Sequence, residues 1–171
     1  MEIIAETSRE MVDSMSDIVW AINPERDHLS DLIQRMRHFT EELLDAQDIG
    51  YQFIVAENLK DIELGADQRR EIYLIFKECV NNLAKHSGAT ETEFVVSLEN
   101  GNLIIGIKDN GRGFDVTEKS GGSQNGFGGN GLRNIKKRAK KCGGACRIAS
   151  EIGNGTSIVL EIPVGKNYFS V

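Results

Sequence analysis

A β-hairpin near the middle of the chain constrains the fold more than any other feature. The segment TEFVVSLENGNLIIGIKDNG alternates apolar and polar residues on both sides of Asn100-Gly101, a dipeptide that favours a tight hairpin turn. Because strand side chains alternate between two faces, Leu103, Ile105 and Ile107 share one face of the second strand. Asp109 continues the same row. The hairpin therefore predicts a sheet with one covered face and an inward carboxylate at a strand end.

An inward carboxylate at a strand end needs a partner. Gly111 and Gly113 follow at once in DNGRGFD, and they let the backbone bend without side chains over whatever Asp109 contacts. A lone DNG is also common as a turn in which the Asp makes only local hydrogen bonds. The parity of Asp109 favours the first interpretation, a carboxylate that faces a ligand.

The segments around this hairpin predict an α/β body. YQFIV after Gly50 indicates a short strand, and residues 67–86 indicate a helix. A second hairpin, ACRIAS to SIVLEIP, closes the body and gives Thr156 the parity of its buried neighbours, so the Thr156 hydroxyl faces inward. A buried, internally satisfied hydroxyl explains Thr156 equally well when it is taken alone.

The predicted helix 67–86 carries two neighbouring stripes. One is apolar and consists of Ile72, Phe76, Cys79 and Leu83. Glu78, Asn82 and Lys85 follow one another at helical spacing on the adjacent stripe, with His86 close by. A solvated polar face is the favoured interpretation on this helix alone, and a binding surface is the alternative.

Glycine is concentrated in the C-terminal part, where 15 of the 18 glycines lie between residues 101 and 165. Residues 115–131 are polar and glycine-rich, which is typical of a mobile lid. The segment ends in GGNGL before an amphipathic helix, whose free N–H groups and dipole would form a phosphate site. Arg133 is best placed to meet phosphate. We expect most of the other basic residues of this helix to be solvated, namely Lys136, Lys137, Arg138, Lys140 and Lys141. A flexible loop that enters a helix is the alternative.

Two apolar stripes precede the body. Met11, Met15, Ile18 and Ile22 form the first, Asn23-Pro24 interrupts it, and Leu32, Met36, Phe39 and Leu43 form the second. Two amphipathic helices packed on the domain would produce this pattern. The pattern would be the same if the first of these helices belonged to a helical bundle completed by another chain or by residues upstream.

Composition limits the functional classes. With 40% hydrophobic and 27% charged residues, the chain fits one compact soluble domain with one appended element. Residues 1–50 hold 4 Lys and Arg against 12 Asp and Glu, which argues against a nucleic-acid partner. No apolar run is long enough to span a membrane, and the acidic start is no secretory signal. The 3 cysteines have no zinc or disulfide spacing, so they predict free thiols in a reducing compartment.

Four motifs in order, ECVNNLAKH, DNGRGFD, GGNGL and GTS, closely resemble the ATP-binding domain of sensor histidine kinases. This domain belongs to the GHKL superfamily, which includes gyrase, the Hsp90 chaperone and MutL. The resemblance covers about residues 49–164. It implies an α+β fold, a two-layer α/β sandwich of the Bergerat type, in which helices cover one face of a mixed sheet and ATP lies between the helices and the lid.

The resemblance also implies roles for single residues. Asn82 would bind Mg²⁺ through its amide oxygen, together with triphosphate and water. Asp109 would accept the proton of the adenine amino group, and Glu78 could orient or deprotonate an attacking group, in a kinase by assisting the acceptor imidazole. By the same resemblance Lys85 and His86 meet phosphate or ribose, Gly111 and Gly113 lie beneath the purine, Gly129, Gly131 and Leu132 end the lid at the phosphates, and Thr156 supports the adenine contact.

The N-terminal arm resembles the second helix of the dimerisation and phosphoacceptor hairpin. Residues 1–46 would then be that helix and a connector, and residues 47–171 the ATP-binding catalytic domain. The family's acceptor His is normally followed by an acidic residue, but Leu, Phe and Ser follow His28, His38 and His86. We therefore expect the acceptor helix, the sensor and any membrane segment upstream of Met1.

Two functional classes remain open. In the first, this is the catalytic part of a homodimeric, cytoplasmic histidine kinase that moves the γ-phosphoryl group of Mg-ATP to a separate His, for relay to the receiver domain of a response regulator. In the second, it is a nucleotide-binding regulator of the same fold, such as an anti-sigma serine kinase or a degenerate module that only binds partners. The acidic arm with its Asn-Pro break favours the first.

Overall fold

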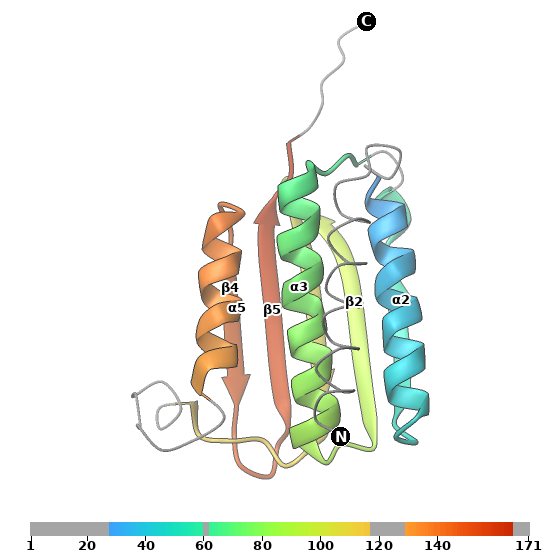
Figure 1. Ribbon diagram of the computed structural model, residues 1–171, viewed down its shortest axis with the longest axis vertical. Coiled ribbons are helices and arrows are strands. Elements are labelled where there is room, and N and C mark those ends of the chain that lie inside the picture. The colour runs from blue at the N-terminus through green and yellow to red at the C-terminus, as the bar shows by residue number, and fades with distance from the viewer. Residues whose placement is uncertain (1–27, 60–61, 117–128, 166–171) are drawn as a thin grey trace, which may run out of the picture.

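The computed structural model describes residues 28–59, 62–116 and 129–165 of the chain, and in this part three helices lie side by side on one face of a β-sheet, with α3 in the middle (Figure 1). The elements in chain order are α2 (Leu29–Asp45), β1 (Gly50–Val55), the short 3₁₀ helix η2 (Glu57–Leu59), α3 (Ala66–Asn82), the π-turn η3 (Leu83–Ser87), β2 (Glu91–Glu99), β3 (Asn102–Asp109), α5 (Gly129–Lys141), β4 (Ala145–Ser150) and β5 (Thr156–Pro163).

The sheet is mixed. Its strand order is β1-β2-β3-β5-β4, with β1 parallel to β2 and all other pairs antiparallel. The predicted hairpin is confirmed: Glu99 pairs with Asn102, and Asn100 and Gly101 have φ values of 51° and 81°, the positive values that a tight two-residue turn needs. The hairpin of β4 and β5 is confirmed as well. The architecture is the predicted α+β sandwich of two layers.

The core lies between the sheet and the helices. The predicted apolar stripe of α3 is buried along its whole length, from Ile72 to Leu83. Over β1 and β2 the rings of Phe53, Phe76 and Phe94 meet, with centroids 5.4 to 6.3 Å apart. Aromatic contacts at these distances add to the burial term, so they fix α3 over the parallel strand pair.

Helix α2 contains the second apolar stripe of the arm. Leu32 and Met36 are fully buried against the body, and Phe39 and Leu43 are partly buried. Residues 29–45 therefore pack on the domain, which does not distinguish the two alternatives, because these differ in the place of the first stripe. The first stripe lies outside the described residues, so the division of the chain after residue 46 stays a prediction. Among the described residues, no helix combines the length and apolar composition needed to cross a bilayer.

The C-terminal end of α3 differs from the continuous helix that the sequence predicts. The α-helix ends at Asn82, and residues 83–87 form a π-turn that Gly88 ends at φ 62°. The Ser87 hydroxyl donates to the Leu83 carbonyl at 2.7 Å and accepts the Ala89 N–H at 2.9 Å. Such a side chain competes with the backbone for its hydrogen bonds, and single π-turns are frequent at functional sites.

Candidate functional site

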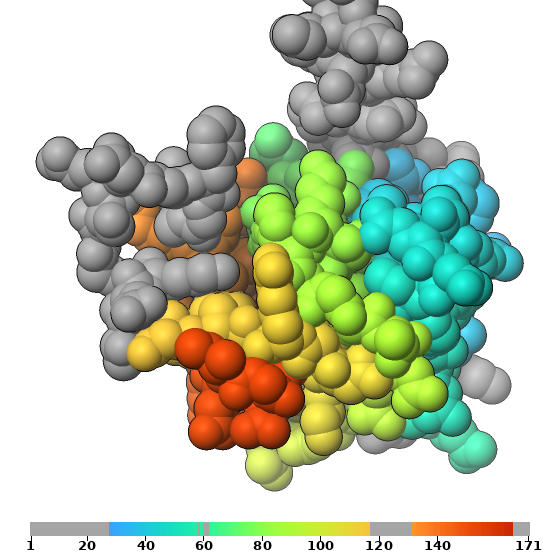
Figure 2. Space-filling model, turned by 90° about the horizontal axis from the view of Figure 1, so that it is seen from below, coloured from blue at the N-terminus to red at the C-terminus, as the bar shows by residue number. Residues whose placement is uncertain are grey.

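One pocket lies where the C-terminal end of α3, the end of β3, the start of α5 and the start of β5 meet. Figure 2 looks onto this end of the molecule, where the yellow segment after β3 lies between the red turn of β4 and β5 and the green end of α3. The residues that line it are Cys79, Asn82, Leu83, His86, Ser87, Ile107, Asp109, Arg112, Gly113, Phe114, Leu132, Thr156 and Ile158. The pocket therefore brings together six of the predicted site residues from four separate segments.

Asp109 forms one side of this pocket and is 7% exposed. Its carboxylate accepts the Gly111 N–H at 2.8 Å and also the Thr156 N–H. Burial raises the pKa of the Asp109 carboxyl, and the two N–H donors offset only part of that rise. Within the described residues no cation pairs with this carboxylate, which leaves it free to accept a hydrogen bond from a ligand.

The two glycines after Asp109 are required by close backbone contacts. A Cβ on Gly111 would meet the Ser87 carbonyl oxygen and would lie 2.8 Å from Asp109 Oδ1. Gly113 has a φ of 60°, and a Cβ there would collide with the Glu151 carbonyl oxygen. Any side chain at either position would displace the segment that lies against the pocket.

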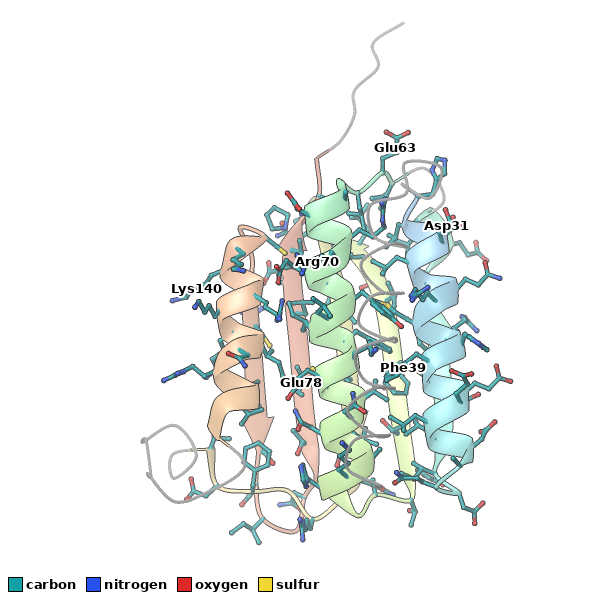
Figure 3. The ribbon with its side chains drawn as sticks, viewed as in Figure 1. Asp31, Phe39, Glu63, Arg70, Glu78 and Lys140 are labelled. Carbon is teal, nitrogen blue, oxygen red and sulfur yellow. The ribbon has the colours of Figure 1, made fainter. Side chains whose placement is uncertain are left out.

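Asn82 and Glu78 form the helical side of the site. Asn82 Nδ2 donates to Glu78 Oε1 at 3.2 Å, and because a carboxylate only accepts, the amide oxygen is turned away from Glu78. In Figure 3 Glu78 projects from α3 toward α5. A Cβ on Gly131 would meet Glu78 Oε1, so the first turn of α5 lies directly against this pair.

The other predicted residues lie at the edge of the pocket or beyond it. His86 lines it from an exposed position in η3, whereas Lys85 and Arg133 are exposed and do not line it. Helix α5 begins at Gly129, earlier than the start at about Leu132 that the sequence predicts, so Gly129 and Gly131 belong to its first turn and not to the segment before it. Most of the predicted lid, residues 117–128, lies outside the described residues. The binding roles of all these residues stay predictions.

Ser150 at the end of β4 is a residue that sequence reasoning missed. Its Oγ lies 3.0 Å from Thr156 Oγ1 and 2.9 Å from the Phe114 N–H that it accepts. The only sequence signal was the position of Ser150 in the alternation of ACRIAS, which many serines with a purely structural role also have. Asn110, between two site residues, has a structural role because its side-chain oxygen accepts the N–H groups of Thr90 and Glu91.

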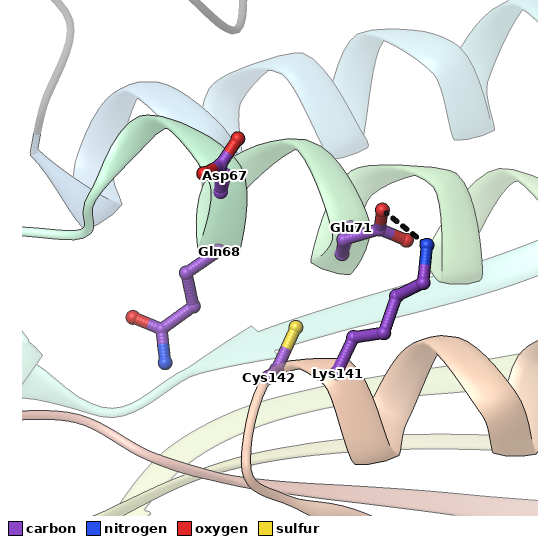
Figure 4. A pocket seen from close by; sticks show the side chains of 5 residues that line it. All are labelled: Asp67, Gln68, Glu71, Lys141 and Cys142. Atoms are coloured by element: carbon purple, nitrogen blue, oxygen red, sulfur yellow. Dashed lines mark hydrogen bonds and ion pairs between the residues drawn. The ribbon is translucent and has the colours of Figure 1, made fainter.

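A second cavity, of about 510 Å³, lies near the other end of α3 (Figure 4). Glu71 in this cavity pairs with Lys141 and with Arg138, so its charge is already neutralised. The cavity contains none of the predicted site residues. Its lining residues are Asp67, Gln68, Glu71, Lys141 and Cys142.

Comparisons with known proteins agree with this geometry. The model of the family described as histidine kinase-, DNA gyrase B- and HSP90-like ATPase matches residues 67–166. The fold and the pocket thus define an ATPase domain of the histidine kinase type, and the chain belongs to this family. The resemblance and the fold class predicted from the sequence are confirmed.

Two relatives carry names from sensor systems. Over 123 residues, or 72% of the chain, it is 26% identical to the sensor histidine kinase LiaS of Bacillus subtilis, of which it covers 32%. Over 112 residues, or 66% of the chain, it is 30% identical to the sensor protein VraS of Staphylococcus epidermidis, of which it covers 30%. The chain therefore spans about a third of the length of these curated relatives.

The catalytic domain of the histidine kinase ThkA, solved in a nucleotide-free form, has the same fold. The TM-score is 0.64 at 20% identity, over 80% of this chain and 93% of that one.

Proposed function

We propose that this chain is the ATP-binding catalytic part of a sensor histidine kinase, which transfers the γ-phosphoryl group of Mg-ATP to a histidine on another segment. The observation that carries the proposal is the convergence of Asn82, Asp109 and Thr156 on one pocket from α3, β3 and β5. An unpaired carboxylate at one side and a polar helix at the other fit a molecule with an amino-bearing base and a charged tail. Adenosine triphosphate has both.

The residues present fit Mg²⁺. The Asn82 amide nitrogen is engaged by Glu78, so the atom left for a cation is a hard oxygen, the type of ligand that Mg²⁺ prefers. One protein oxygen is enough, because Mg²⁺ in such sites takes its other ligands from phosphates and water. When bound, the ion would neutralise charge on the transferred phosphoryl group.

The chain's own residues would bind and orient. Asp109 holds the base, and the free N–H groups at the start of α5, beside Gly131, bind phosphate oxygens. In this proposal Glu78, next to Asn82, would orient the acceptor imidazole and accept its proton. In this proposal Lys85, His86 and Arg133 would meet the phosphates or the ribose.

None of the 3 histidines is placed as a phosphoacceptor in this proposal. His28 precedes α2, and His38 is exposed on α2, 3.5 Å from Glu42. Helix α3 lies between α2 and α5 (Figure 1). His86 lines the nucleotide pocket itself. The acceptor would be supplied by the dimerisation hairpin of the same kinase.

The proposal includes the cellular context of such a kinase. The phosphoryl group would pass from the acceptor His to an aspartate in the receiver domain of a response regulator. The complete kinase would act as a homodimer, with this part in the cytoplasm. The two relatives named above are described as a sensor histidine kinase and a sensor protein, which supports this context.

Incubation with γ-labelled ATP and Mg²⁺ tests the transfer. The chain alone should bind nucleotide but retain no label, because a phosphoryl group needs a positioned nucleophile. A separate segment that carries the acceptor helix should become labelled in its presence, with a bond that is acid-labile and alkali-stable. Such a label on the chain by itself would show that one of its own histidines is the acceptor. A failure to bind ADP with Mg²⁺ in calorimetry would overturn the proposal as a whole.

A further inference from the structure

The hydroxyl of Ser150 joins three segments beside the pocket. Its Oγ accepts the Phe114 N–H at 2.9 Å, donates to the Gly155 carbonyl oxygen at 2.9 Å and lies 3.0 Å from Thr156 Oγ1. These contacts connect the segment after β3, the turn of β4 and β5, and the first residue of β5. Phe114 and Thr156 both line the pocket.

The number of protons fixes the direction of each hydrogen bond. A serine hydroxyl has one proton and a carbonyl oxygen only accepts, so the proton of Ser150 goes to Gly155. The contact between the two hydroxyls then requires Thr156 to donate to Ser150. Thr156 has no other side-chain proton. Only lone pairs of its oxygen remain for a molecule in the pocket.

Asp109 presents the same polarity. It is the direct partner of Thr156 in the register of β3 and β5. Its carboxylate accepts N–H groups from Gly111 and Thr156, and an ionised carboxylate has no proton to donate. Two adjacent side chains therefore offer acceptors, and neither offers a donor.

We propose that Ser150 is a positioning residue for base selection: it holds the Thr156 hydroxyl as an acceptor, so that the pocket prefers a purine with an amino group over one with a keto oxygen. The inference rests on the proposed binding of ATP. A keto oxygen opposite Asp109 and Thr156 would face two acceptors, and a buried polar atom without a partner is costly. Without Ser150, the Thr156 hydroxyl could turn its proton into the pocket and meet that oxygen.

Calorimetry with ADP and with inosine diphosphate, both with Mg²⁺, tests the proposal, because inosine has a keto oxygen where adenosine has the amino group. The wild-type chain should bind ADP more tightly. Ser150→Ala should lower the ratio of the two affinities at least about fivefold, a change of the size expected for one hydrogen bond. Ser150→Thr, which keeps a hydroxyl, should restore the ratio. Ser157→Ala, on the opposite face of β5, should leave it unchanged.

A double-mutant comparison separates this role from a structural one. If Ser150 acts through Thr156, Ser150→Ala has no further effect on the ratio in a Thr156→Val background. Thr156→Val removes the acceptor oxygen, so it should lower the ratio of the two affinities. Because it leaves the bonds of Ser150 to the backbone in place, it tests the inference even where Ser150→Ala does not fold. An unchanged ratio in Thr156→Val, or an equal loss of both affinities in a folded Ser150→Ala, would overturn the inference alone. A wild-type chain that binds neither nucleotide would overturn the proposed function and the inference together.

Discussion

Two carboxylates, Glu71 in α3 and Asp109 at the end of β3, lie near opposite ends of α3 and differ in what surrounds them. Near the first turns of α3, Glu71 pairs with Arg138 at 2.6 Å and with Lys141 at 3.5 Å. Burial alone would raise the pKa of Glu71, but the hydrogen bond and charge of Arg138, together with Lys141, outweigh it and lower the pKa. At the other end, Asp109 has two backbone N–H groups and no cation among the described residues, and burial raises its pKa.

The difference distinguishes a structural carboxylate from one available to a ligand. Glu71 is paired with two cations of α5, so its charge joins the two helices, and Figure 4 shows the pair with Lys141. Asp109 is not satisfied in this way, and a buried charge without a partner costs stability. A perturbed carboxyl that lines a pocket points to function, whereas a paired one points to packing.

The largest effect is expected for Asp109→Asn. The amide can present an N–H where the purine amino group needs an acceptor, so ADP affinity should fall by about 1 to 3 kcal/mol in calorimetry. The free energy of unfolding without nucleotide should not decrease, because the change removes an unpaired buried charge. Glu71→Gln is the matched control and should leave ADP affinity unchanged, because Glu71 lines the other cavity.

The same carboxyl predicts a pH dependence of binding. Since the pKa of Asp109 is raised above 3.8, it takes up a proton at a higher pH than an ordinary Asp as the solution is acidified. ADP affinity should therefore begin to fall above the pH range in which exposed Asp residues titrate. Asp109→Asn should lack this part of the profile. Full affinity in the Asn variant would make Asp109 a structural turn residue.

A smaller effect is expected for Asn82→Ala. Its amide oxygen is lost from a coordination shell that otherwise consists of phosphate and water, so ADP affinity with Mg²⁺ should fall by roughly tenfold. Affinity in EDTA should change little. Asn81→Ala, one residue away and outside the pocket lining, is the control. Equal losses with and without Mg²⁺ would indicate damage to α3 instead of a lost ligand.

The periodic parts of the fold were predictable from the sequence. Strand parity placed Asp109 and Thr156 on the buried face, and both line the pocket. Helical spacing placed Asn82 beside Glu78, and the two side chains are hydrogen-bonded. In each case the prediction concerns positions within one element, where spacing along the chain determines which side chains share a face.

The contacts between distant elements were not predictable. Arg138 and Lys141 read as solvated, yet they pair with Glu71, which precedes them by 67 and 70 residues. Ser150 reaches Phe114 across 36 residues. Hydropathy patterns indicate which face is buried, but they do not specify which polar atoms meet once the faces have packed. The π-turn was missed for a related reason, because it depends on one hydroxyl that competes with the backbone.

The smallest effect is expected for the stability of Glu71→Gln. The pKa of Glu71 is lowered in the folded state, so its ionised form stabilises the fold at pH values above the usual pKa of 4.5. This contribution is lost as the pH falls through the lowered pKa. Urea denaturation at pH 7 should show a loss of about 1 kcal/mol, since the pair is partly exposed. The difference between wild type and variant should disappear as the pH is lowered well below 4.5. Glu57→Gln, at an exposed position with no ion pair among the described residues, should show no such difference at any pH. A loss that persists unchanged in acid would mean that the shape of the glutamate side chain, and not its charge, holds α3 against α5.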